Sequence, residues 1–227
     1  MREWPNRGER ALVIMAKAPR PGHVKTRLAS SLSREAIVEL YKCLIEDTIQ
    51  LARSVATDAL AIVCPSADVA DLAAWLPDIE VVAQKGTGLA AGLASAFRVF
   101  IDRGYQQVIA LDGDSPQISC KTVVQAFHLL HSSDVVVGPT TDGGYYLVGV
   151  STTTDAALFD HDRMGTGGAL DSLLAAAHKQ NLTAALTEAA YDVDEPRDLE
   201  RLSRELEQFP CRAPRTARWL ACGNSRR

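Results

Sequence analysis

Short apolar runs alternate with longer amphipathic segments along this chain, and this alternation constrains the fold more than any other feature. Apolar runs of four to eight residues predict buried strands, and segments with a 3.6-residue period predict helices. Strand–helix alternation of this kind predicts an α/β fold whose mostly parallel sheet is covered on both faces. The expected strands are 11–16, 59–64, 79–83, 107–111, 134–138 and 145–150, with a candidate at 183–187, and the expected helices are 33–54 (with Ser33 as N-cap), 69–75, 89–102, 122–131, 168–178 and 195–208.

The loop between the strands expected at 134–138 and 145–150 is too short for a helical crossover, which favours a mixed sheet. A chain of 227 residues fits one large α/β domain. We expect an N-terminal extension over residues 1–10, a single domain over 11–210, and a basic tail over 211–227 that is poorly ordered unless it docks.

Composition argues against several classes of protein. The net charge of -4 provides no global attraction to nucleic acid or to an anionic membrane surface. No apolar stretch is long enough to span a bilayer, and the first ten residues lack the apolar core of a signal peptide. The five cysteines are scattered without C-x-x-C spacing, which favours the reduced thiols of a cytoplasmic protein.

A basic loop follows the first predicted strand. Residues 17–27, KAPRPGHVKTR, contain four cations, Lys17, Arg20, Lys25 and Arg27, on a backbone shaped by proline and glycine. In open α/β sheets, ligands bind beyond the carboxyl ends of the strands. We therefore expect this loop to bind the phosphates of a nucleotide, with a solvated basic loop as the alternative.

Two pairs of aspartates are candidates for a metal site. Asp112 and Asp114 end the fourth strand in the sequence LDGDSP, where their spacing points both carboxylates to one side of an extended backbone. Their mutual repulsion is relieved by a hard divalent cation, Mg²⁺ or Mn²⁺, although Asp-Gly is also a common turn. Asp192 and Asp194 repeat the spacing, and Asp194 is alternatively the N-cap of a helix with Pro196 in its first turn.

Two glycine-rich turns could approach a ligand. Residues 86–92, GTGLAAG, lack the spacing of a dinucleotide fingerprint, yet Gly86 and Gly88 could lie against a nucleobase or phosphate. Asp142, Gly143 and Gly144 allow a tight turn, and the tyrosines that follow, Tyr145 and Tyr146, either line an acceptor pocket or belong to the core.

Taken together, the segments KAPRPGHVKTRL, LDGDSP, GPTTDGGYYLVG and YDVDEPRDL resemble a bacterial family within the nucleotide-diphospho-sugar transferase superfamily. This DUF2064-type glycosyltransferase family includes members associated with arsenosugar biosynthesis. It is similar to 2-phospholactate guanylyltransferase and, more distantly, to molybdenum-cofactor guanylyltransferase. The resemblance covers residues 11 to 207, and this chain differs from the family in having Asp112 instead of glycine and Thr87 instead of an acidic residue.

The resemblance implies a glycosyltransferase-A-like, Rossmann-like three-layer sandwich with a mixed, mostly parallel sheet. It implies that Lys25 and Arg27 hold phosphates, that Asp114 is the main metal carboxylate, and that Asp192 or Asp194 completes the metal site. It also implies that the turn at 142–144 faces the acceptor.

Three functional hypotheses follow. The first is a metal-dependent glycosyltransferase with a nucleotide-sugar donor and a small-molecule acceptor, in which Asp114, Asp142 and Lys25 are catalytic and Asp142 is the general base. The second is a nucleotidyltransferase that releases pyrophosphate. The third is a nucleotide-binding domain without turnover. All three hypotheses are compatible with a homodimer, and none requires nucleic acid or a membrane span.

Overall fold

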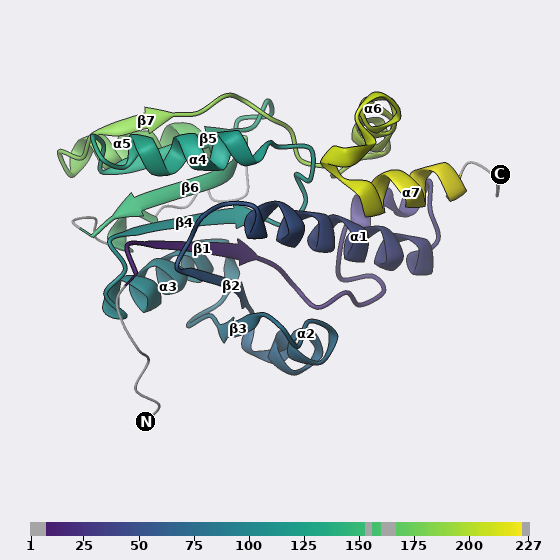
Figure 1. Ribbon diagram of the computed structural model, residues 1–227, viewed down its shortest axis with the longest axis horizontal. Helices are drawn as coiled ribbons and strands as arrows, with labels where there is room; N and C mark the ends of the chain where they lie inside the picture. Colours follow the sequence, from purple (N-terminus) through teal and green to yellow (C-terminus); the bar gives the residue numbers. More distant parts are fainter. Residues whose placement is uncertain (1–7, 153–155, 160–166, 224–227) are drawn as a thin grey trace.

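The computed structural model describes residues 8–152, 156–159 and 167–223, and these form a layered α/β structure around one sheet (Figure 1). Within the described residues the sheet has seven strands in the order β3-β2-β1-β4-β6-β5-β7. The strands are β1 (Arg10–Met15), β2 (Ala59–Cys64), β3 (Glu80–Ala83), β4 (Gln107–Asp112), β5 (Val135–Pro139), β6 (Tyr145–Ser151) and β7 (Ala184–Leu186).

The sheet is mixed, as the short loop after residue 138 predicts. β1 pairs in parallel with both β2 and β4, β2 with β3, and β5 with β7. β6 lies antiparallel between β4 and β5. The tight turn from β5 to β6 therefore makes a hairpin, and the expected three-layer, mostly parallel architecture is confirmed.

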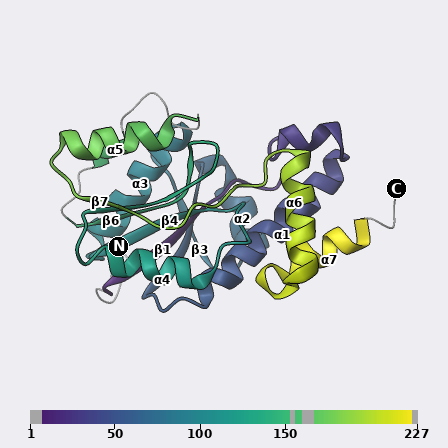
Figure 2. The same cartoon turned by 90° about the horizontal axis from the view of Figure 1, so that it is seen from above.

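Helices cover both faces of the sheet. α1 and α4 pack on one face and α3 and α5 on the other, while α2 lies at the β3 edge and α6 and α7 lie together beyond one end of the sheet (Figure 2). The helices are α1 (Arg34–Arg53), α2 (Val69–Trp75), α3 (Gly88–Asp102), α4 (Cys120–Leu129), α5 (Ala169–Lys179), α6 (Pro196–Gln208) and α7 (Pro214–Gly223), with short 3₁₀ turns η1 (Thr26–Ser30), η2 (Ser66–Asp68), η3 (Ala156–Phe159) and η4 (Pro210–Arg212). In the described parts of the chain, no helix combines the length and the apolar character that crossing a bilayer requires.

The two cores follow from the alternation of side chains along each strand. In β1, Leu12 and Ile14 pack toward α1 and α4, whereas Ala11 and Val13 pack toward α3 and α5. All four are fully buried, as expected of a central parallel strand covered on both faces. β1 is thus flanked by β2 and β4 within the sheet and by helices on both faces, which fixes the position of the loop that follows it.

The long helix α1 begins where the sequence predicts. The Ser33 hydroxyl oxygen accepts a hydrogen bond from the backbone N–H of Ala36 at 3.1 Å, which satisfies one of the free donors of the first turn. An apolar stripe that includes Leu40, Leu44 and Ile45 is buried against the sheet. The loop before α1 is therefore anchored at both ends, by β1 and by a capped helix.

Residues 214–223, within the segment expected to be a surface tail that is poorly ordered unless it docks, form helix α7, which docks on α1. The buried carboxylate of Asp47 on α1 accepts hydrogen bonds from the backbone N–H groups of Arg215 and Thr216, at 3.1 and 2.8 Å. These are first-turn donors of α7 that have no partner within the helix. The cap comes from a residue far away in the sequence, so proline at the first position, Pro214, is the local signal for the start of α7, and the docking itself has none.

We predict that Asp47→Ala detaches α7 from α1. Loss of the carboxylate leaves one buried and one partly buried N–H donor without acceptors, which should lower the free energy of unfolding by about 2 kcal/mol. Urea denaturation measures this loss, and limited proteolysis should show new cleavage within 213–223. The control is Glu39→Ala, which removes only an exposed ion pair with Lys42 and should cost about 0.5 kcal/mol or less. Equal losses in the two variants would contradict the docking role of Asp47.

Candidate functional site

A cavity of about 690 Å³ opens at the carboxyl ends of β1, β2 and β3. The chain runs outward from β1 to β2 and β3 and then returns to β4 on the other side of β1, so the strand order reverses between β1 and β4. Loops diverge at such a switch point, and ligands of open α/β proteins bind there. The cavity is lined by Met15, Ala16, Lys17, His23, Val24, Lys25, Tyr41, Val63, Pro65, Ser66, Ala67, Gln84, Gly86, Thr87, Gly88, Leu89, Asp114 and Asp194.

Lys25 is the centre of the charged end of this cavity. Its Nζ forms an ion pair with Asp114 Oδ2 and another with Asp194 Oδ1, the latter at 2.6 Å, and its side chain is only 4% exposed. Arg27 extends the cluster, because its guanidinium lies 3.3 Å from Asp194 Oδ2. Three segments that are distant in the sequence therefore meet at one buried ammonium group.

The local backbone holds Lys25 in this place. Lys25 adopts a left-handed conformation (φ 45°, ψ 42°) immediately before η1. This conformation is uncommon outside glycine and signals a constraint imposed by the surroundings. The flanking side chains of Val24 and Leu28 are buried in the core on the α1 face, so the loop is anchored on both sides of the lysine.

The segment that carries Asp194 is tied to the loop after β4. The backbone N–H of Val193 donates to the carbonyl oxygen of Asp114 at 3.2 Å, and the Gln117 side-chain amide donates to the carbonyl oxygen of Tyr191. Asp194 does not cap α6. Glu195 is the N-cap, in a reciprocal capping box with Asp198, which overturns the alternative interpretation of Asp194.

The electrostatics of the cluster are governed by burial and by the number of carboxylates. Burial disfavours the charge on Lys25, but the adjacent Asp114 and Asp194 offset this and raise the pKa of Lys25 above its usual value. Burial and the charge of Asp114 raise the pKa of Asp112 well above its usual range, although Ser115 donates a hydrogen bond to it at 2.7 Å. Burial, Asp114 and Asp194 together raise the pKa of Asp192 to about 6.

The four cations of the basic loop have different surroundings. Lys25 and Arg27 lie with the carboxylates, and Lys17 lines the cavity, where its backbone N–H donates to the Tyr41 hydroxyl oxygen at 3.0 Å. Arg20 is separate from them. Its guanidinium binds Asp68 at 2.6 Å, Asp71 at 2.7 Å and the carbonyl oxygen of Ala67 at 3.0 Å, and it does not line the cavity. This geometry assigns Arg20 to bracing the loop against the η2–α2 segment, where the sequence suggested phosphate binding.

The turn at 142–144 has a rigid geometry. The Asp142 carboxylate accepts hydrogen bonds from the Thr140 hydroxyl at 2.5 Å and from the backbone N–H of Gly144 at 3.1 Å. The Thr140 bond in particular lowers the pKa of Asp142, which weakens it as a proton acceptor. Gly143 has a φ of 89°, and a Cβ there would lie 2.0 Å from the carbonyl oxygen of Gly167, so only glycine fits.

The two tyrosines after this turn have different surroundings. Tyr146 is a core residue, with 1% of its surface exposed and its hydroxyl bonded to Thr187 and to the Glu188 carbonyl oxygen. Tyr145 is half-buried against the core on the α3 and α5 face, and burial raises the pKa of its hydroxyl. Neither lines the cavity described above.

Sequence reasoning missed Tyr41 and correctly drew attention to the glycine loop. Gly86 and Gly88 line the cavity with φ values of 81° and 84°. Tyr41 projects from α1, and burial raises the pKa of its hydroxyl to about 12. The available signal was a hydroxyl group among the apolar residues of α1 that face the sheet, because such a group requires a partner when buried.

The carboxylates fit a hard divalent cation in their chemistry. Asp114 and Asp194, with Asp192 close enough to influence both, supply the oxygen ligands that Mg²⁺ and Mn²⁺ prefer. In the described residues, no three acidic, histidine or cysteine side chains already converge in the geometry of a metal site. The Lys25 ammonium lies among these oxygens, so a bound cation would require Lys25 to move.

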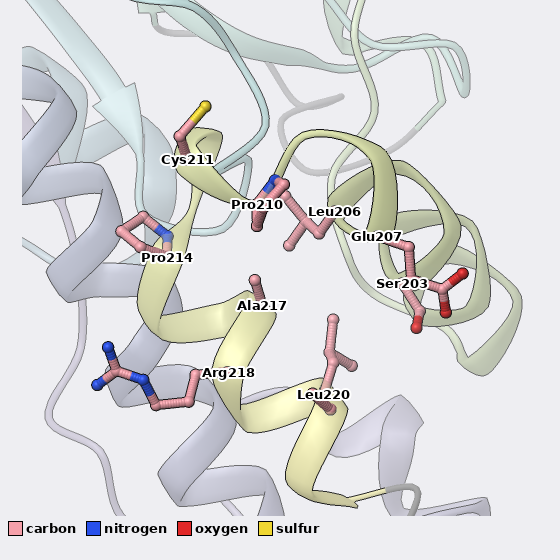
Figure 3. A pocket seen from close by; sticks show the side chains of 10 residues that line it. Ser203, Leu206, Glu207, Pro210, Cys211, Pro214, Ala217, Arg218 and Leu220 are labelled. Carbon is pink, nitrogen blue, oxygen red and sulfur yellow. The ribbon is translucent and has the colours of Figure 1, made fainter.

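A second cavity, of about 550 Å³, lies between α6 and α7 (Figure 3). Its lining is mostly apolar and includes Leu206, Pro210, Pro214 and Leu220, with Glu207 and Arg218 at its edge. Its lining contains one cation, Arg218, and no residue from the end of a strand, so it lacks the cluster of charges found in the β1–β3 cavity.

Comparison with known proteins agrees with this fold. Residues 48–166 match DUF2064, a family of uncharacterized proteins conserved in bacteria. The chain belongs to this family. The family match begins at residue 48, near the end of α1, continues beyond β6, and includes Asp112, Asp114 and the turn at 142–144. None of the curated proteins matches the chain.

Several solved structures share the fold. A protein from Desulfovibrio desulfuricans G20, provisionally named a nucleotide-diphospho-sugar transferase, is 29% identical, with a TM-score of 0.89 over 96% of each chain. A nucleotidyl transferase from Methanothermobacter thermautotrophicus is 17% identical, with a TM-score of 0.65 over 89% of this chain and all of the other. A Mycobacterium tuberculosis H37Rv protein in complex with manganese is 20% identical, with a TM-score of 0.56 over 87% of this chain and 98% of the other.

We predict that Asp192→Asn stabilises the metal-free protein at neutral pH and above. The raised pKa of about 6 means that the folded state keeps a proton that the unfolded chain releases near pH ~4. The contribution of Asp192 to stability therefore falls as pH rises between these values. The variant should match the wild type at pH ~4 and exceed it by about 1 kcal/mol at pH ~8, a figure reduced for solvent screening.

Urea denaturation in the presence of EDTA measures this difference at each pH. Asp78→Asn, at an exposed position between α2 and β3, is the matched control and should show no pH-dependent gain. A gain for Asp192→Asn that is the same at both pH values would contradict the assignment.

Proposed function

We propose that this protein is a metal-dependent glycosyltransferase that takes a nucleotide sugar as donor and a small molecule as acceptor. The observation that carries the proposal is the meeting of Lys25, Asp114 and Asp194 at the charged end of the switch-point cavity. Cations and carboxylates at one end of a large cavity suit a ligand that has a diphosphate at one end and an uncharged body at the other.

Each part of the cavity has a task in this proposal. The loops after β2 and β3, with Pro65 and Gly88 among their residues, surround the nucleoside. Lys17, Lys25 and Arg27 hold the phosphates and offset the charge that develops on the leaving nucleoside diphosphate. Asp114 and Asp194 hold a divalent cation, which when bound supplies further neutralisation of that charge. The cavity volume of about 690 Å³ suits a ligand of this size.

One observation favours a second candidate, nucleotidyl transfer. Attack by an acceptor hydroxyl on a sugar carbon benefits from a general base, but the pKa of Asp142 is lowered and its carboxylate is engaged in the turn. A phosphorylated acceptor is already ionised and needs no base when it attacks the α-phosphate of a nucleoside triphosphate. The same cations and carboxylates would serve that reaction.

We predict that a matching nucleotide or nucleotide sugar raises the thermal midpoint of the protein in the presence of Mn²⁺ or Mg²⁺. A ligand at about 100 times its Kd should raise the midpoint by roughly 5 °C. The screen compares uridine, guanosine, cytidine and thymidine nucleotides and their sugars. In Asp114→Asn the metal-dependent part of the shift should disappear, whereas Asp78→Asn should behave as the wild type. An unchanged shift in Asp114→Asn would contradict the metal-site role.

The products distinguish the two reactions. A glycosyltransferase releases a nucleoside diphosphate from a nucleotide sugar, and a nucleotidyltransferase releases pyrophosphate from a nucleoside triphosphate. We expect nucleoside diphosphate release that depends on divalent metal and falls by about 100-fold or more in Asp114→Asn. Pyrophosphate release instead would assign the second function. Ligand binding with neither product, across an acceptor panel, would identify a nucleotide-binding domain without turnover.

A further inference from the structure

The position of Lys25 has a consequence for the order in which ligands can bind, and this inference rests on the proposed function. The Lys25 ammonium pairs with Asp114 Oδ2 and Asp194 Oδ1, the same carboxylates that the proposal assigns to the divalent cation. A divalent ion bound to these two oxygens would lie next to the ammonium group, and the two positive charges would repel each other strongly in this partly buried site. In the ligand-free protein, Lys25 therefore competes with the metal for its site.

Lys25 is not free to leave this position without compensation. Its side chain is 4% exposed, and Asp114 and Asp194 are only 26% and 38% exposed. Separating a buried pair leaves desolvated charges without partners, which costs far more than separating a surface pair. Arg27 differs in this respect, since its side chain is 66% exposed and can exchange Asp194 for water.

A phosphate group supplies the compensation. Lys25 lines the cavity, so an anion bound there would give the ammonium a new partner within reach of a long, flexible side chain. As the ammonium turns toward the phosphate, Asp114 and Asp194 lose their counter-ion and become ligands for a cation. The movement of Lys25 and the release of the two carboxylates both favour binding of metal together with phosphate over binding of metal alone.

We propose that Lys25 is an interlock that keeps divalent metal out of the site until a phosphate-bearing ligand binds. The size of the coupling between phosphate and metal depends on how often Lys25 is turned away from the carboxylates when no phosphate is bound. If the arrangement with Lys25 turned away is populated at about 1–10% without phosphate, the apparent affinity for metal is about 10–100-fold weaker than the intrinsic affinity. By linkage, metal and phosphate then strengthen each other's binding by the same factor.

Binding of Mn²⁺ alone, measured by electron paramagnetic resonance of the free ion, tests the interlock on the full-length protein. Lys25→Met keeps most of the apolar stem and removes the competing ammonium, so it should bind Mn²⁺ without phosphate about tenfold more tightly than the wild type, or better. Arg27→Met removes the same charge from the same cluster and should change the affinity by less than about threefold, because Arg27 is exposed to solvent. Equal effects of the two substitutions, or no gain in Lys25→Met, would overturn the proposal.

A second measurement needs no variant of Lys25. The buried ammonium should give a protected signal in the lysine ¹⁵N spectrum, whereas Lys17, Lys85, Lys121 and Lys179 are exposed. Inorganic pyrophosphate with EDTA present should shift this signal, and Mg²⁺ alone, without EDTA, should not. A shift caused by Mg²⁺ alone, or no response to pyrophosphate, would overturn the interlock.

The outcomes separate the interlock from the function on which it rests. If the wild type binds Mn²⁺ tightly without phosphate and turns over a nucleotide sugar, the interlock is wrong and the proposed function stands. If neither the wild type nor Lys25→Met binds Mn²⁺, with or without pyrophosphate, both ideas fail together.

Discussion

The arrangement of the candidate site depends on one buried positive charge. An ammonium group removed from water is tolerated only where carboxylates replace its hydration, and Lys25 has two, Asp114 and Asp194. Asp114 lies in the loop after β4 and Asp194 in the segment before α6. The ion pairs of Lys25 therefore also hold these two segments and the loop after β1 together. The left-handed backbone at Lys25 belongs to the same arrangement, since the burial of Val24 and Leu28 leaves the loop little freedom to relax.

The sheet explains why these loops meet where they do. β1 is central and parallel to both of its neighbours, so the loops after β1, β2 and β4 all leave the same edge of the sheet. The path from β3 back across to β4 separates the loops on either side of β1 and leaves room for a ligand. β6 is antiparallel to both β4 and β5, so β5 runs in the same direction as β4, and the turn at 142–144 that follows β5 lies at this edge. The position of the cavity is thus a property of strand order.

Much of this could be predicted from the sequence, because periodicity is a local property. β2 and α2 have the expected bounds, and Ser33 caps α1 as its hydroxyl predicts. The remainder depends on contacts between distant residues. The partners of Arg20 on the η2–α2 segment and the cap that Asp47 gives to α7 leave no mark on neighbouring sequence. The meeting of Lys25 with Asp114 and Asp194 was predicted, but from the family resemblance, which implies one site for these residues, and not from local sequence. A run of positive residues identifies a loop as basic. Only the folded structure distinguishes a cation that pairs with other side chains of the protein from one that faces the cavity.

The docking of α7 on α1 also bears on how the chain matures on the ribosome. α1 belongs to the first quarter of the sequence, whereas the backbone groups that satisfy the Asp47 carboxylate lie 168 and 169 residues later. The α1 surface that α7 covers therefore stays without this partner until residues 214–223 have been synthesised. Until then, the growing chain exposes an apolar face of α1 and the Asp47 carboxylate, both of which the folded protein buries, and exposed surface of this kind favours misassembly.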